Sequence, residues 1–308
     1  MSAAVGVFVQ HKVSELARQK KYDKQTYDVV LERLMSNADG TFLWVALVCQ
    51  DLQATARRNV LKKLDTFPPG LNALYKRMME QISVSDDAEL CKQVLALIAL
   101  VYRPITLDEL MALAKPLEDI AIKAEVREII SMCGSFLTLR GDTVYFVHQS
   151  AQDFLFAKAY EEIFPYGVQS AHEMIFLRSL AILSRTLQRD MYKLEALGVA
   201  IKDVQAPKPD PLAASRYSCV YWIDHLYNSK PEKSQADSVS NLNVISAVDK
   251  FIRKKYLYWL EGLSLCESIG KGIRSMAKLC SLVQVWHAEI QRLNNVLQKE
   301  LTFSGDAG

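Results

Sequence analysis

The sequence predicts a mainly α-helical protein in three parts: a helical bundle, then a winged helix of three helices plus a β-hairpin, then an irregular α-helical array. Two observations lead to this prediction. Helical periodicity, without a competing two-residue alternation, fills the N-terminal and C-terminal parts of the chain. Between them lie three helical segments followed by two strand-like runs around a Gly-Asp turn. We therefore expect three domains, over residues 1–83, 84–165 and 166–308.

The N-terminal domain is predicted to be a bundle of short helices. Its helical pattern is interrupted at Gly40 and at the segment FPPGL (67–71), where glycine and proline break helices. Apolar residues recur at helical spacing on both sides of these breaks. The expected helices cover residues 5–19, 25–37, 42–54, 57–65 and 70–82.

The middle domain opens with a strongly apolar helix that ends at Arg103-Pro104, because the residue before a proline disfavours helical backbone. A second helix has a sharply defined start. Thr106 is its predicted N-cap, and Glu109 stands at the third helical position, which completes a capping box. A third helix is expected over 120–131.

A β-hairpin completes the middle domain. Gly141-Asp142 fits a two-residue turn, which pairs Arg140 with Thr143. Side chains alternate between the two faces of a strand, and His148 lies at an even spacing from Val144. We therefore expect His148 to point inward, on the apolar face of the hairpin.

His148 is the candidate functional residue from the sequence alone. Ser150 and Asp153, three residues apart, have the spacing of a helix N-cap box, so a strand should pass into a helix at this point. The N-terminus of a helix favours anions through its free amides and its dipole. His148 could therefore contact a ligand there, or it could be a core histidine bonded to a backbone carbonyl. The residues leave both interpretations open.

The C-terminal domain returns to a helical pattern without a repeat of fixed period, so a regular solenoid is not predicted. Two polar or proline-rich connectors interrupt it, at 202–211 and 228–240. The expected helices cover residues 170–187, 191–199, 212–228, 241–262 and 265–298.

The composition is that of a soluble globular protein. Half of the residues are apolar, and 37 basic residues nearly balance 35 acidic ones, for a net charge of +2. This balance argues against a nucleic-acid binder and against a polybasic membrane anchor. The longest apolar stretch, 94–102, is far shorter than a membrane span, and no signal-peptide pattern opens the chain. We expect a soluble cytoplasmic protein whose scattered cysteines are reduced and buried.

No catalytic site and no metal site is predicted. A P-loop needs the pattern GxxxxGK[ST], and around Gly270-Lys271 a leucine and a glycine replace the first glycine and the Ser or Thr. The five histidines lie far apart, without a second ligand at helical spacing. We therefore expect a non-enzymatic protein that holds no cofactor in isolation. The segment 120–131 carries two basic and two acidic residues, which disfavours a DNA-recognition helix.

Several stretches together resemble one family. In chain order they are NADGTFLWVALVCQDLQ, LDTFPPGLNALYKRMMEQI, YRPITLDEL, SFLTLRGDTVYFVHQSAQDFL, CVYWIDHL and KYLYWLEGLSL. They are similar to the segments that follow the nucleotide-binding core in fungal NACHT proteins of the vegetative-incompatibility type, which are NOD-like signal-transducing ATPases. The stretches span nearly the whole chain in the order of the family, so they are specific as a set.

The resemblance implies a fragment or a truncated member, because an upstream P-loop core and downstream WD or ankyrin repeats accompany these segments in full-length relatives. It also implies that the winged helix folds back on bound ADP in a closed state. His148, in the motif FxHxSxxDFL, would then touch the β-phosphate. Phe42 occupies the position of a proline that lies against adenine in related receptors, which makes it a possible adenine-side contact.

We therefore expect a non-catalytic regulatory module of a NACHT-type signal-transducing ATPase, which closes over ADP or ATP held by the P-loop core. A nucleotide shifts such an equilibrium only if it binds the two states differently. Two alternatives stay open: a stand-alone protein-interaction adaptor and, less favoured, a winged-helix DNA-binding regulator.

Overall fold

The computed structural model describes residues 3–117, 122–194, 198–229 and 238–305. It is mainly α-helical with one small sheet, which confirms the predicted fold class. The chain divides into two compact units. Unit 1 comprises Met1–Leu95, Arg127–Leu139 and Tyr145–Ile163, and unit 2 comprises Ala96–Val126, Arg140–Val144 and Phe164–Gly308. The three predicted domain boundaries stay a prediction.

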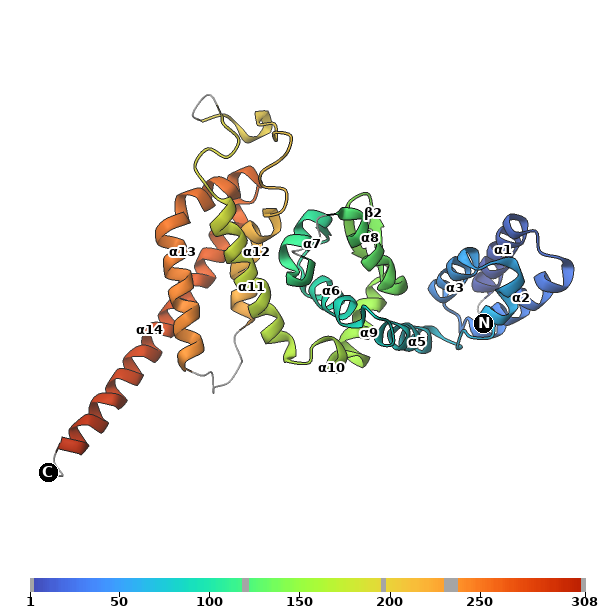
Figure 1. Cartoon of the computed structure of the whole chain (residues 1–308), viewed down its shortest axis with the longest axis horizontal. Coiled ribbons are helices and arrows are strands. Elements are labelled where there is room, and N and C mark those ends of the chain that lie inside the picture. Colours follow the sequence, from blue (N-terminus) through green and yellow to red (C-terminus); the bar gives the residue numbers. More distant parts are fainter. Residues whose placement is uncertain (1–2, 118–121, 195–197, 230–237, 306–308) are drawn as a thin grey trace. The chain divides into compact units, whose positions relative to one another are not determined.

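Unit 1 begins with the predicted bundle, in which α1 packs against α2 and α3 (Figure 1). The Asp23 carboxylate starts α2 by accepting a hydrogen bond from the Thr26 backbone at 2.8 Å. The indole of Trp44, fully buried on α3, donates to the Pro68 carbonyl at 3.1 Å and so fastens the proline-rich break to the bundle. The elements are α1 (Ala3–Lys20), α2 (Lys24–Asn37), α3 (Phe42–Ala54), the 3-10 helix η1 (Arg57–Asn59), α4 (Val60–Leu64) and α5 (Leu71–Ser83).

The winged helix has its three predicted helices and a small sheet. Its helices are α6 (Ala88–Leu100), α7 (Leu107–Leu113) and α8 (Lys123–Met132), and its strands are β1 (Ile105–Thr106), β2 (Leu137–Arg140) and β3 (Thr143–Phe146). The helix predicted over 120–131 begins at Lys123, and residues 120 and 121 lie outside the described part of the chain.

The β-hairpin has the predicted strands and turn. Gly141 has a φ of +62°, which a glycine tolerates without steric cost. The Val147 amide donates to the Phe136 carbonyl at 2.9 Å, in the register that a two-residue turn sets. The sheet has a third strand that we did not predict, since β1 pairs antiparallel with β3 and gives the order β1-β3-β2. Two residues are too few to show a strand pattern.

Helix α7 starts at the predicted capping box. The Thr106 hydroxyl accepts a hydrogen bond from the Glu109 amide at 3.3 Å, and the Glu109 carboxylate accepts one from the Thr106 amide at 3.0 Å. Two amides that the helix leaves unpaired are thereby satisfied.

Replacing Thr106 by alanine should lower the free energy of unfolding by about 0.5–2 kcal/mol while the fold is retained, because one helix cap is lost. Urea unfolding of the purified chain measures this loss. Thr106→Ser keeps the hydroxyl and is the matched control, which should unfold close to the unchanged protein. Equal midpoints for alanine and the unchanged protein would mean that the cap adds no stability.

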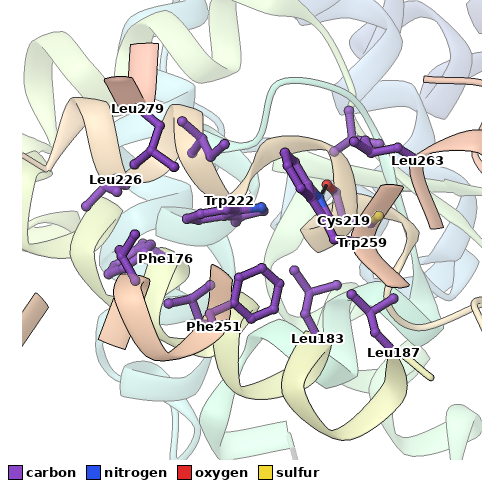
Figure 2. Close-up of a cluster of buried hydrophobic side chains, with 14 of the residues drawn as sticks. Phe176, Leu183, Leu187, Cys219, Trp222, Leu226, Phe251, Trp259, Leu263 and Leu279 are labelled. Atoms are coloured by element: carbon purple, nitrogen blue, oxygen red, sulfur yellow. Dashed lines mark hydrogen bonds between the residues drawn. The ribbon is translucent and has the colours of Figure 1, made fainter. Parts of the chain in front are cut away.

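Unit 2 is built on four long helices around an aromatic core. They are α11 (Gly167–Thr186), α12 (Arg216–Asn228), α13 (Ser238–Leu265) and α14 (Ile269–Gly305), and two 3-10 helices, η2 (Lys115–Leu117) and η4 (Ile201–Asp203), lie in the same unit. Trp222 and Trp259 meet edge to face in its centre, with ring centroids 5.8 Å apart (Figure 2). Phe251 packs against Trp222 at 5.3 Å, and the Trp259 indole donates to the Cys219 carbonyl at 2.8 Å. The core therefore joins α12 to α13.

The helix predicted over 191–199 is wrong in its described residues. Asp190 and Lys193 adopt positive φ angles of 53° and 51°, which a right-handed helix excludes. The Glu261 carboxylate accepts hydrogen bonds from the amides of Asp190 and Met191 and holds this turn in place. Residues 195–197 and most of the connector predicted at 228–240 lie outside the described part.

Two predictions of burial are also wrong. The helical spacing of the segment KYLYWLEGLSL (255–265) predicts that Leu257, Trp259, Leu260 and Leu263 pack in the core. Leu257 is instead 73% exposed, while Trp259 and Leu263 are buried. Cys280 is exposed on α14, whereas four other cysteines are buried as predicted and Cys266 is half-buried. The apolar residues of α13 therefore extend beyond the face that packs into the core of unit 2.

Candidate functional site

His148 lies between β3 and α9 (Gln149–Lys158) and acts as the N-cap of that helix. Its backbone is extended, and its Nδ1 atom accepts a hydrogen bond from the Ser150 amide at 3.1 Å. An imidazole nitrogen thus takes the role that a Ser, Thr, Asp or Asn oxygen has at most helix starts.

The structure corrects the predicted orientation of His148. Its side chain is exposed and does not point into the core. The strand ends at Phe146, two residues before the histidine, so the alternation of strand faces no longer applies to it. The predicted N-cap box is also wrong, because the helix starts before Ser150 and the Asp153 carboxylate accepts from the Gln149 side chain instead, at 3.1 Å.

A chain of hydrogen bonds through the hydroxyl groups of Ser150 and Tyr75 connects His148 to the interior of unit 1. The Ser150 hydroxyl lies 2.9 Å from His148 Nδ1 and 3.1 Å from the Tyr75 hydroxyl of α5. Tyr75 is fully buried, and its ring stacks on Phe136 at 5.3 Å and contacts Phe154 at 5.4 Å. Burial raises the pKa of the Tyr75 phenol, so the group stays protonated at neutral pH and can donate.

These contacts decide which nitrogen of a neutral His148 carries the proton. A backbone N–H can only donate, so Nδ1 must accept and the proton lies on Nε2. Within the described residues Nε2 has no hydrogen-bond partner, and the imidazole is exposed. The site therefore offers an N–H donor at the start of a helix, which suits an acceptor oxygen of an anion.

Phe42, the possible adenine-side contact, is the first residue of α3. Its ring is 47% exposed and packs edge to face on Phe8 of α1, at 5.3 Å. The segment before it turns at Gly40, whose φ is +70°, and Thr41 is the N-cap of the helix. The Thr41 hydroxyl donates to the Asp39 carbonyl at 3.3 Å and makes no capping hydrogen bond. No described contact joins Phe42 to His148. The role of Phe42 toward adenine stays a prediction.

Unit 2 contains a buried ion pair. The capping role of Glu109 is predicted from the sequence, but its ion pair with Arg103 is not. Glu109, only 1% exposed, accepts two hydrogen bonds from the Arg103 guanidinium, at 2.6 and 2.8 Å. It also accepts the amide of Tyr217 on α12 at 2.9 Å, in addition to the amide of Thr106. The Arg103 guanidinium lies 5.3 Å from the centre of the Tyr217 ring. This arrangement joins the start of α7 to α12 and is structural.

Two histidines lie next to this ion pair, inside unit 2. Their Nδ1 atoms, from His172 of α11 and His225 of α12, are 2.8 Å apart, and the Tyr217 hydroxyl lies 2.7 Å from Nε2 of His225. Burial lowers the pKa of both histidines, and for His225, which is fully buried, it falls to about 3. Both are neutral at pH 7, so they can share a single N–H···N hydrogen bond.

The comparisons with known proteins agree with this architecture. Residues 75–165 match the family model described as "GPI inositol-deacylase, winged helix domain". The chain is 46% identical over 298 residues to the Vegetative incompatibility protein HET-E-1 of Podospora anserina, an alignment that covers 92% of the chain. The resemblance to fungal NACHT proteins of the vegetative-incompatibility type is confirmed.

This vegetative-incompatibility relative is much longer than the matched segment, since the chain spans 22% of its length. No solved structure matches the chain. None of the described helices is both long and apolar enough to cross a bilayer. Nor do the described residues bring three or more His, Cys, Asp or Glu side chains together as metal ligands.

Proposed function

We propose that this chain is a non-catalytic regulatory module of a NACHT-type signal-transducing ATPase, acting in the cytoplasm. The module closes over ADP or ATP held by a P-loop core in a longer protein, where WD or ankyrin repeats and protein partners complete the signalling assembly. The similarity to a vegetative-incompatibility protein over 92% of the chain supports this role. The exposed Nε2–H donor of His148 is the observation that supports a contact with the nucleotide.

The mechanism is a latch that depends on the nucleotide. In the closed state His148 Nε2–H donates to a β-phosphate oxygen of ADP, and the N-terminus of α9 adds a favourable dipole. The exposed ring of Phe42 offers a flat apolar surface for the adenine. In the open state His148 is away from the nucleotide. ADP therefore favours the closed state by the free energy of this contact, which exists in one state only.

His148→Ala should release ADP faster when the chain replaces the matching segment of its vegetative-incompatibility relative. One hydrogen bond to a phosphate, on the order of 1–3 kcal/mol, is lost from the closed state alone. The open population should rise roughly 5- to 150-fold. Stopped-flow release of a fluorescent ADP analogue measures the first effect, and basal oligomerisation measures the second.

His11→Ala is the matched control, because His11 is another exposed histidine of unit 1, on α1. It should leave ADP release unchanged. If His148→Ala lowers the unfolding temperature but releases ADP at the original rate, His148 is a helix cap without a nucleotide contact and the latch is disproved.

A further inference from the structure

We infer that Tyr75 and Ser150 are positioning residues for His148. Their hydroxyl groups hold the imidazole with Nδ1 facing the protein and Nε2–H facing outward. This inference deepens the proposed function, and its phosphate aspect rests on that function. The first observation is the continuity of the chain Tyr75 Oη, Ser150 Oγ, His148 Nδ1, with successive distances of 3.1 and 2.9 Å.

The groups at the two ends of this hydrogen-bond chain, His148 and Tyr75, set the direction of each hydrogen bond. At one end the Ser150 amide donates to Nδ1, so this nitrogen is unprotonated in the neutral ring. The Ser150 hydroxyl facing the same nitrogen must then donate to it as well. At the other end Tyr75 keeps its proton, because burial raises the pKa of its phenol, and it donates to the Ser150 oxygen. The chain therefore runs in one direction, from Tyr75 to His148.

The burial of Tyr75 stabilises this chain of hydrogen bonds. The Tyr75 side chain is fully buried against the rings of Phe136 and Phe154, where a hydroxyl without a partner is costly. Ser150 satisfies it and stands in the first turn of α9, one residue beyond Gln149. The packing of α5 against α9 is thereby linked to the orientation of an exposed imidazole on the surface.

The consequence concerns the class of ligand. An imidazole fixed as an Nε2–H donor favours an acceptor, such as a phosphate or phosphate-ester oxygen, over a metal ion, which needs an unprotonated nitrogen. If the two hydroxyl groups are removed, only the Ser150 amide still favours an unprotonated Nδ1, so the other tautomer, with the proton on Nδ1 and a bare Nε2, becomes more populated. Ser150 and Tyr75 thus strengthen the preference of the outward edge for donating.

Nitrogen NMR of the whole chain, labelled with ¹⁵N-histidine and held at about pH 8.5 where an ordinary imidazole is neutral, tests this inference. The His148 signals are assigned by their loss in His148→Ala. In the unchanged protein Nε2 should carry the proton. Ser150→Ala should raise the ratio of the Nδ1–H to the Nε2–H tautomer about fivefold, the effect of one ordinary hydrogen bond. Tyr75→Phe acts through Ser150 and should raise this ratio less, about twofold.

Two further variants separate positioning from general damage to the fold. Ser150→Thr restores a hydroxyl and should return the tautomer ratio of His148 to that of the unchanged protein. Gln149→Ala removes hydrogen bonds to Gln152 and Asp153 on the same turn and should leave the ratio unchanged. A ratio that is the same in Ser150→Ala and in the unchanged protein would overturn the inference. A shifted ratio, with ADP release unaffected by His148→Ala, would uphold the positioning and reject only the latch.

Discussion

Replacing Glu109 by glutamine should lower the free energy of unfolding by about 3 kcal/mol, the lower end of the cost of breaking a buried ion pair. The Glu109 carboxylate accepts four hydrogen bonds, from the Arg103 guanidinium and from the amides of Thr106 and Tyr217. An amide would direct its own N–H groups at some of these donors and would leave Arg103 without a counter-charge. The lower end applies because the Arg103 side chain is 34% exposed and stays partly hydrated.

Urea unfolding followed by circular dichroism measures the loss. Glu128→Gln makes the same chemical change at an exposed position of α8 and should alter the stability by less than about 0.5 kcal/mol. If Glu109→Gln is as stable as Glu128→Gln, then solvent compensates the ion pair completely and it contributes nothing to the fold.

Acidification below about pH 6.5 should destabilise unit 2. The pKa of His225 is lowered from 6.5 to about 3, first by burial and then by the nearby His172, whose own pKa is lowered by burial. Below about pH 6.5 the unfolded chain therefore binds protons that the folded chain refuses, so stability falls as the pH falls, until about pH 3. At about pH 4.5 His225 alone should cost about 2–3 kcal/mol.

The groups around the histidine pair do not reverse this sign. Tyr102 and Tyr217, whose rings contact His225, stay neutral because burial raises the pKa of both phenols. Unfolding midpoints in urea at several pH values between about 7.5 and 4.5 measure the effect.

The double variant His172→Gln/His225→Gln removes both groups that titrate and should flatten the pH profile in this range. His11→Ala, at an exposed histidine, should keep the slope of the unchanged protein. If the double variant is as sensitive to acid as the unchanged protein, the loss arises from other groups and the buried pair is not its cause.

Local patterns in the sequence predicted local structure well. The Thr106–Glu109 box and the Gly141-Asp142 turn each depend on residues that are adjacent or three apart, and both are present in the structure. The orientation of His148 was wrong for an equally local reason. The alternation of faces counted from Val144 holds within a strand, but β3 ends two residues before His148. The start of α9 then turns the His148 side chain outward.

The contacts that define the candidate site could not be predicted in the same way. Tyr75 and Ser150 are 75 residues apart, and His172 and His225 are 53 apart, so each pair meets only through the packing of different helices. A buried tyrosine within a helix looks like any other core residue in the sequence. The resemblance to the vegetative-incompatibility family pointed to His148, and its motif includes Ser150, but it gave no indication that the Tyr75 hydroxyl lies behind them.

The perpendicular indoles of unit 2 provide an optical signal of their own. Trp222 and Trp259 are close enough, at 5.8 Å and 72° between their planes, for their electronic transitions to couple. Such a coupled pair contributes to near-ultraviolet circular dichroism only while its geometry is fixed. Acid that loosens the core without melting α12 and α13 would erase this signal and leave the far-ultraviolet helix band intact. The two spectral regions therefore separate loss of side-chain order from loss of helix in one sample.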